Sequence, residues 1–200
     1  MTTAQRVRQL LGTPDSQLDY AKAKVGFDQI VDPKTSGQAV HAQLGVWLKT
    51  ARDMAGQDAP DNRKLAALRR TIYDPGPWNG GRPFAYDLSD PLGQKPGNQL
   101  LATYLKTRLG NCVSMPSLFL ILADQMGVSG VALVDAPLHL FVRYTDATGH
   151  VFNLETTSGA HVTRDVWYRE KLPMSDRSVE SGLYMRALSR REAVAVRGHP

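Results

Sequence analysis

Apolar residues recur at helical spacing through the first part of the chain, and three helices are predicted there. The first covers about residues 14–32, because the residue before Pro33 avoids helical geometry. The second covers residues 36–56 and carries apolar side chains at positions i, i+4, i+7, i+8 and i+11. The third covers residues 59–72. Such stripes are typical of helices that pack on other elements, so we expect a helical layer over residues 1–75.

Residues 74–97 have a different pattern, with five of the twelve prolines and five of the seventeen glycines. Proline and glycine at this density exclude a helix or a central strand. The segment also contains Trp78, Phe84 and Tyr86. A free linker has no need of three aromatic side chains, so we predict an irregular surface loop that packs on the domain.

After residue 97 the apolar pattern changes period. A short amphipathic helix is followed by a helix that is apolar on all sides and therefore buried. Alternating segments then predict strands joined by tight turns, and two helices complete the chain. The predicted helices are 98–109, 112–126, 164–171 and 178–196, and the strands are 131–134, 138–144 and 151–155. This order predicts an α+β fold, with residues 76–200 as the core and one compact unit overall.

The distribution of charge argues against a nucleic-acid partner. The chain carries 24 basic and 19 acidic residues, and the excess of +5 lies at both ends rather than in one patch. The basic cluster at residues 186–191 contains no aromatic side chain, so we expect a solvated helix face there. No apolar run approaches the roughly 20 residues of a membrane span, and the first ten residues lack the apolar part of a signal peptide. We therefore expect a cytoplasmic protein; a periplasmic location stays open if a leader has been removed.

Cys112 is the one cysteine of the chain, which excludes an internal disulfide and a thiolate-rich metal site. It lies at the start of the most buried predicted helix. The helix dipole and the unpaired amides of the first turn favour the thiolate, which is the reactive form of cysteine. Two other interpretations stay open, a small buried apolar residue and a redox-sensing thiol that needs an external partner.

His139 and Glu155 lie on neighbouring predicted strands joined by a turn at residues 146–149. A side chain near residues 153–155 can therefore approach His139. Together with Cys112, this order suggests a nucleophile, a base and a carboxylate that orients the base. Taken alone, His139 is equally consistent with a hydrogen-bonded core histidine, and Glu155 with a surface carboxylate.

Three motifs around these residues resemble the catalytic core of the transglutaminase-like superfamily, which has a papain-like fold. They are Gly110-Asn-Cys112-Val-Ser, Pro137-Leu-His139-Leu-Phe-Val-Arg and Asn153-Leu-Glu155-Thr-Thr-Ser-Gly159. The resemblance implies Cys112 as nucleophile, His139 as base and Glu155 as the acid. The preceding helices and the proline-rich loop further resemble a bacterial branch whose core follows a helical N-terminal region. The implied fold is a buried helix carrying the cysteine, packed on a small antiparallel sheet.

The sequence departs from the superfamily pattern at Glu155, where aspartate is usual. Asn153 lies two residues earlier on the same face and is the alternative residue that would orient His139. The expected activity is cysteine-dependent acyl transfer, with hydrolysis of an amide bond in a protein or peptide as the first choice and no cofactor. Transfer to an amine, and a non-catalytic protein-interaction module on the same scaffold, are the alternatives.

Candidates for the remaining parts of the site are polar or aromatic residues that precede or adjoin the cysteine. The Cys112 amide is one candidate donor to an oxyanion; Asn98, Gln99 and Asn111 are candidates for the second, and Trp78 for a wall of the cleft.

His139, His150 and His161 recur every eleven residues and raise the question of a zinc site. Because His150 is predicted at the hairpin turn, remote from His161, the three are not expected to converge on one metal ion.

Overall fold

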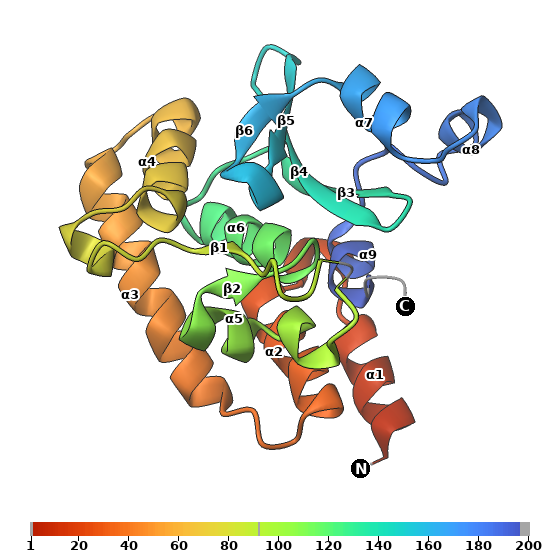
Figure 1. Cartoon of the computed structure of the whole chain (residues 1–200). Coiled ribbons are helices and arrows are strands. Elements are labelled where there is room, and N and C mark those ends of the chain that lie inside the picture. The colour runs from red at the N-terminus through yellow and green to blue at the C-terminus, as the bar shows by residue number, and fades with distance from the viewer. Residues whose placement is uncertain (1, 92, 197–200) are drawn as a thin grey trace.

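The computed structural model of the chain describes residues 2–91 and 93–196. Figure 1 shows the buried helix α6 in the middle of the molecule, with the other long helices on one side and an antiparallel sheet on the opposite side. The helices are α1 Thr3–Leu11, α2 Tyr20–Val31, α3 Gly37–Ala55, α4 Asp61–Tyr73, α5 Leu101–Thr107, α6 Ser114–Gln125, α7 Asp165–Lys171, α8 Asp176–Glu180 and α9 Arg190–Ala195. This mixed architecture is the α+β fold that the sequence predicted.

The helical layer follows the predicted apolar stripes, with two corrections. Helices α3 and α4 confirm the second and third predicted helices. The first predicted helix corresponds to α2 and begins at Tyr20 rather than near residue 14, because residues 15–17 form a single 3-10 turn. Helix α1 was not predicted. Asp19 then caps α2 by accepting a hydrogen bond from the amide of Lys22 at 2.9 Å.

The proline-rich segment is a packed loop, as predicted. Strand β1, Ala85–Tyr86, pairs in parallel with β2, Leu109–Gly110. Phe84 is 2% exposed, and its ring meets the rings of Trp47 and Tyr104 edge-on. The loop is therefore tied to the chain just before Cys112.

Strands β3 to β6 form a four-stranded antiparallel sheet in sequential order. Their bounds are β3 Val131–Ala136, β4 His139–Thr145, β5 Val151–Glu155 and β6 His161–Thr163. The three predicted strands are confirmed. Strand β6 was not predicted, because three residues at a sheet edge are too short to show an alternating pattern.

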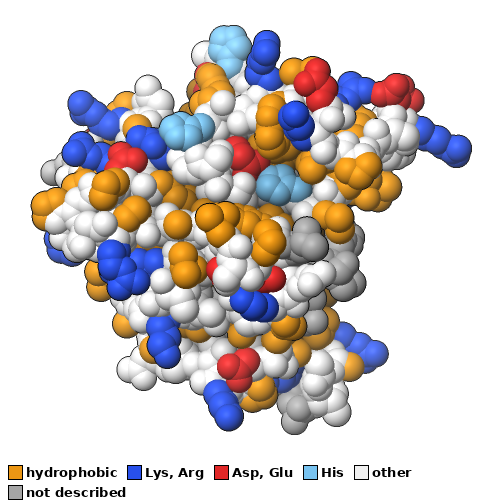
Figure 2. Space-filling model, in the orientation of Figure 1, with side chains coloured by type: hydrophobic (Ala, Val, Ile, Leu, Met, Phe, Trp, Pro, Cys, Tyr) orange, Lys and Arg blue, Asp and Glu red, His pale blue; other side chains and the backbone are white. Residues whose placement is uncertain are grey.

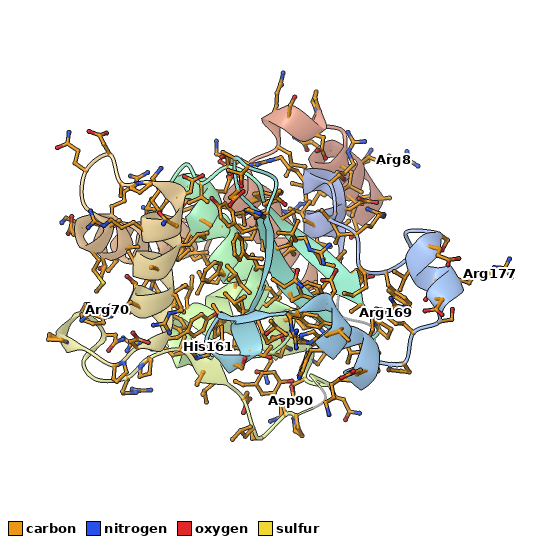
Figure 3. The ribbon with its side chains drawn as sticks, turned by 90° about the horizontal axis from the view of Figure 1, so that it is seen from above. Arg8, Arg70, Asp90, His161, Arg169 and Arg177 are labelled. Atoms are coloured by element: carbon orange, nitrogen blue, oxygen red, sulfur yellow. The ribbon has the colours of Figure 1, made fainter. Side chains whose placement is uncertain are left out.

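The predicted helix over residues 178–196 is wrong. The structure has two short helices, α8 and α9, with an irregular stretch between them. Gly182 has a left-handed backbone with φ of +71°, which ends α8. Beyond it the chain runs beside β3, where the amides of Met185 and Leu188 donate to the carbonyls of Asp135 and Leu133. Pairing with the sheet edge thus replaces helical hydrogen bonds, and Figure 3 shows α8, with Arg177, projecting from the body.

Charged side chains attach the peripheral helices to the core. The buried Asp28 of α2 pairs with Lys24 and accepts a hydrogen bond from the amide of Leu101, at the start of α5. Arg190 of α9 makes two hydrogen bonds to Asp124 of α6. The main apolar core includes residues of α2, α3, α4, α6 and the sheet.

The division of the chain into a helical region and a core at residue 75 stays a prediction.

In the part of the chain that the structure describes, no helix combines the length and apolar character needed to cross a bilayer.

Candidate active site

Cys112 lies in the turn that joins β2 to α6, two residues before the helix begins. Gly110 makes this turn possible: a Cβ there would lie 2.6 Å from the Tyr104 ring and 2.7 Å from Oγ of Ser114. Pro116 falls within the first turn of α6, where a helix tolerates proline. Ten residues of α6 are buried, so the predicted buried helix is confirmed and presents Cys112 at its N-terminal end.

Asn111 fixes the turn from inside. Its Oδ1 accepts hydrogen bonds from the amides of Val113 and Ser114 at 3.0 and 3.1 Å. The residue has no exposed surface, and its Nδ2 has no hydrogen-bond partner among the described residues. A buried amide donor without a partner is costly and uncommon, and this one lies beside Gly93 at the wall of the turn.

His139 begins β4 directly after a strained turn. Leu138 has a left-handed backbone with φ of +57°, and its carbonyl oxygen lies 3.6 Å from Sγ of Cys112. The imidazole Nε2 of His139 lies 2.7 Å from Oε2 of Glu155. Cys112 and His139 line the same cleft, and the thiol is one of the groups that raise the pKa of His139. Because Nε2 faces Glu155, the ring nitrogen left for Cys112 is Nδ1.

Burial of the imidazole opposes its protonation, but the interactions with Cys112 and with the Glu155 carboxylate outweigh burial and raise the pKa of His139 to about 9. Burial likewise opposes ionisation of Glu155, yet hydrogen bonds from His139 and Thr157 lower the pKa of this carboxyl below its ordinary value. Both shifts favour an imidazolium beside a carboxylate.

The Glu155 carboxylate is held at both oxygens. Oε1 accepts from the amide and hydroxyl of Thr157 at 3.0 and 2.6 Å. Oε2 accepts from the hydroxyl of Tyr168 at 3.0 Å, in addition to His139. Sequence reasoning missed Tyr168, because its only signal was one aromatic residue in a short helix after the sheet.

Asn153, the alternative partner of His139, is engaged elsewhere. Its Oδ1 accepts from Nε of Arg143 at 2.8 Å, and its Nδ2 donates to Asp165 at 2.6 Å. Glu155 is therefore the residue that contacts the imidazole. The side chains of His139, Phe141 and Arg143 share one face of the sheet, as the alternation of the strand predicted, and α7 covers this face.

Cys112 and His139 open into a cleft of about 380 Å³. Gln99 and Asn111 line it, as does part of the proline-rich loop. Figure 2 shows a band of hydrophobic side chains across this face of the molecule, below the sheet. The described residues that line the cleft are Tyr86, Pro91, Gly93, Gln94, Gln99, Asn111, Cys112, Val113, Pro137, Leu138, His139, Leu172 and Pro173.

Asn98 and Trp78 do not line this cleft. Asn98 donates to both Asp87 and Asp90 at 2.9 Å, in the loop that Figure 3 marks with Asp90. Trp78 is half-buried and donates from Nε1 to the carbonyl of Thr71. Both side chains stabilise the loop rather than form a wall of the site.

The three histidines at eleven-residue spacing lie apart. His150 is exposed at the hairpin turn and contacts Thr148, whereas His161 is opposite Glu155 in the sheet register. Within residues 2–91 and 93–196, no group of three or more histidine, cysteine, aspartate or glutamate side chains is arranged to hold a metal ion.

Comparison with known protein families gives a match to the model described as the transglutaminase-like superfamily, over residues 38–175. The chain belongs to the transglutaminase-like superfamily. Comparisons with curated proteins and with solved structures gave no match. The superfamily match covers all three motifs and begins within the helical layer, at the start of α3. It accords with a papain-like cysteine fold for the member described here.

Proposed function

We propose that the protein is a cysteine-dependent acyl-transfer enzyme that hydrolyses an amide or ester bond. The observation that carries the proposal is that Cys112 and His139 line one cleft while His139 is bonded to the buried Glu155. A thiol, an imidazole and a buried carboxylate in this order are the groups that nucleophilic catalysis needs. Membership of the superfamily supports the same chemistry.

In the proposed reaction, Sγ of Cys112 attacks the carbonyl carbon of the substrate while its proton resides on Nδ1 of His139. The new C–S bond gives a tetrahedral oxyanion. When this collapses, the bond to the leaving nitrogen or oxygen breaks, and His139 gives its proton to the leaving group. Water then attacks the thioester, His139 accepts a proton from it, and the acid and free thiol are released.

Glu155 serves two purposes in this scheme. Its bond to Nε2 turns Nδ1 of His139 toward the thiol, and its negative charge stabilises the imidazolium that forms. The raised pKa of His139, about 9, keeps the proton available for the leaving group at neutral pH.

Nδ2 of Asn111 and the backbone amide of Cys112 are proposed as the two donors to the oxyanion. The capping contacts of Oδ1 fix the Asn111 side chain. Nδ2 is itself buried beside Gly93, so the proposal requires the loop at Gly93 to shift before Nδ2 can donate to the oxyanion. Gln99, which also lines the cleft, is the remaining candidate donor.

The uncharged lining of the cleft suits a substrate whose acyl group is also uncharged. Among the described lining residues there is no lysine, arginine, aspartate or glutamate, whereas Leu138, Leu172 and Pro173 contribute apolar surface. A peptide segment with an apolar side chain beside the reacting carbonyl fits these walls. Charged groups there would lose hydration without gaining a partner.

A burst assay with p-nitrophenyl acetate tests the proposal without knowledge of the natural substrate. We expect one equivalent of p-nitrophenol to be released rapidly and an acetyl group to appear on Cys112 by mass spectrometry. Cys112→Ser should abolish the burst, and His139→Ala should slow it. Addition of a primary amine then measures the partition between water and amine as acceptor, which distinguishes hydrolysis from transamidation.

Absence of the burst and of the acetyl adduct in correctly folded protein would contradict the proposal. A non-catalytic interaction module on this scaffold would then be the better account.

A further inference from the structure

Tyr168 contacts the proposed triad from outside the three motifs. It lies on α7, has no exposed surface, and donates its hydroxyl proton to Oε2 of Glu155 at 3.0 Å. The same oxygen accepts from Nε2 of His139 at 2.7 Å. Tyr168 and His139 therefore meet at one carboxylate oxygen.

The Tyr168 ring is held rigidly in place. It stacks on Phe141 with ring centroids 3.9 Å apart and planes inclined by 12°. Trp167 meets it edge-on at 5.1 Å. Tyr168 and Phe141 belong to a small separate apolar cluster beneath α7, together with residues of β3 and Met185. This packing fixes the position of the hydroxyl independently of Glu155.

Glutamate needs such a fixed donor more than aspartate does. It has one more rotatable bond, so its carboxylate has more freedom to turn away from the imidazole. Thr157 holds Oε1 and Tyr168 holds Oε2, so both ends of the carboxylate are bound by protein donors.

We infer that Tyr168 is a positioning residue, whose hydroxyl holds Oε2 of Glu155 in line with Nε2 of His139 and so directs Nδ1 toward Cys112. This inference rests on the proposed function. Burial and the Glu155 charge raise the pKa of Tyr168 above its usual range, so the phenol stays protonated and remains a donor wherever the enzyme would act.

Tyr168→Phe tests this role because it removes the hydroxyl and keeps the stacked ring. We expect the rate of acetylation of Cys112 in the burst assay to fall about tenfold or more, the scale of one lost hydrogen bond to a charged group. Tyr20→Phe is the matched control, since Tyr20 is also buried and lies on α2, away from the triad. It should react at the wild-type rate.

The decisive comparison is Tyr168→Phe in a Glu155→Gln background. If Tyr168 acts through the carboxylate, Tyr168→Phe should slow acetylation of the Glu155→Gln protein by less than about twofold. An equal loss in both backgrounds would mean a general structural role and would overturn the inference, as would no loss in the single variant. Failure of the wild-type protein to form the acetyl adduct would instead refute the proposed function itself.

If Tyr168→Phe does not fold, the wild-type protein provides the test. The Tyr168 hydroxyl proton should be visible by NMR and show a nuclear Overhauser effect to the Nε2 proton of His139. Absence of this contact, with the Nε2 proton observed, would overturn the inference.

Discussion

Nε2 of His139 lies 2.7 Å from Oε2 of Glu155, although the two residues stand at the ends of different strands. The sheet register explains the contact: Val142 pairs with Leu154, so Glu155 follows opposite Phe141, and His139 lies two residues farther along the same face of β4. The register alone brings the two side chains within reach, and the donors around Glu155 fix its direction.

The length of the acidic side chain is the first property to test. Glu155→Asp retracts the carboxylate by one methylene, so the carboxylate should lose its hydrogen bonds with His139 and Tyr168. The acetylation rate should then fall at least about tenfold. Glu155→Gln keeps the length but removes the charge that stabilises the imidazolium, and a loss of roughly 10² to 10⁴ is expected. Rapid-mixing measurement of the p-nitrophenol burst gives both rates. An aspartate variant as fast as wild type would contradict the geometry.

Asn111 offers a test that separates two chemistries of the same thiol. Acetylation passes through an oxyanion, whereas alkylation by iodoacetamide does not. Asn111→Ala should therefore slow acetylation by roughly 10² to 10³ and leave alkylation largely unchanged. Ser114→Ala is the control. The Ser114 hydroxyl bonds to Asn111 in the same turn, so its removal perturbs the turn but keeps Nδ2 of Asn111. Equal slowing of both reactions in Asn111→Ala would remove Asn111 from the proposed oxyanion site.

The turn before Cys112 should tolerate no side chain at Gly110. A methyl group there would meet the Tyr104 ring and Ser114 at well below contact distance, so Gly110→Ala should cost about 1 to 3 kcal/mol in the free energy of unfolding. Gly45→Ala in α3, where nothing lies within 4 Å, should be neutral or stabilising by up to about 1 kcal/mol. Urea unfolding of both variants checks the contrast, and equal stability of the two would refute it.

His139 also makes stability depend on pH. Its pKa is about 9 in the folded protein and close to 6.5 in an unfolded chain, so folding favours the protonated form. The stabilisation is complete below about pH 6.5 and is lost as pH rises through 9. Urea unfolding at pH 6 and pH 9.5 should show a larger loss of stability for the wild type than for His139→Gln. The same loss in both proteins would contradict the raised pKa.

The sequence predicted best those site residues whose position follows from their immediate neighbours in the chain. Cys112 lies two residues after Gly110 and just before an apolar helix, and His139 alternates with Phe141 on a strand, so residue type and spacing indicate both positions. The distinction between Asn153 and Glu155 was not readable, because it depends on Arg143 and Asp165 capturing Asn153.

Tertiary contacts decided the features that sequence reasoning missed. Tyr168 reaches Glu155 only because α7 folds back over the sheet. The predicted helix over residues 178–196 fails because the chain there pairs with the edge of β3, and local helical periodicity carries no information about that neighbour.

The rate of alkylation of Cys112 by iodoacetamide, measured against pH in the wild type and in His139→Ala, tests the central claim most directly. It needs no substrate, and the single cysteine makes the product unambiguous. If His139 holds the proton of the thiol, the wild type should react nearly as fast at pH 6 as at pH 8. In His139→Ala the rate should fall by roughly 10² over that range, as for a free cysteine with a pKa of about 8.5. A wild-type protein that loses reactivity as steeply as His139→Ala would contradict the account.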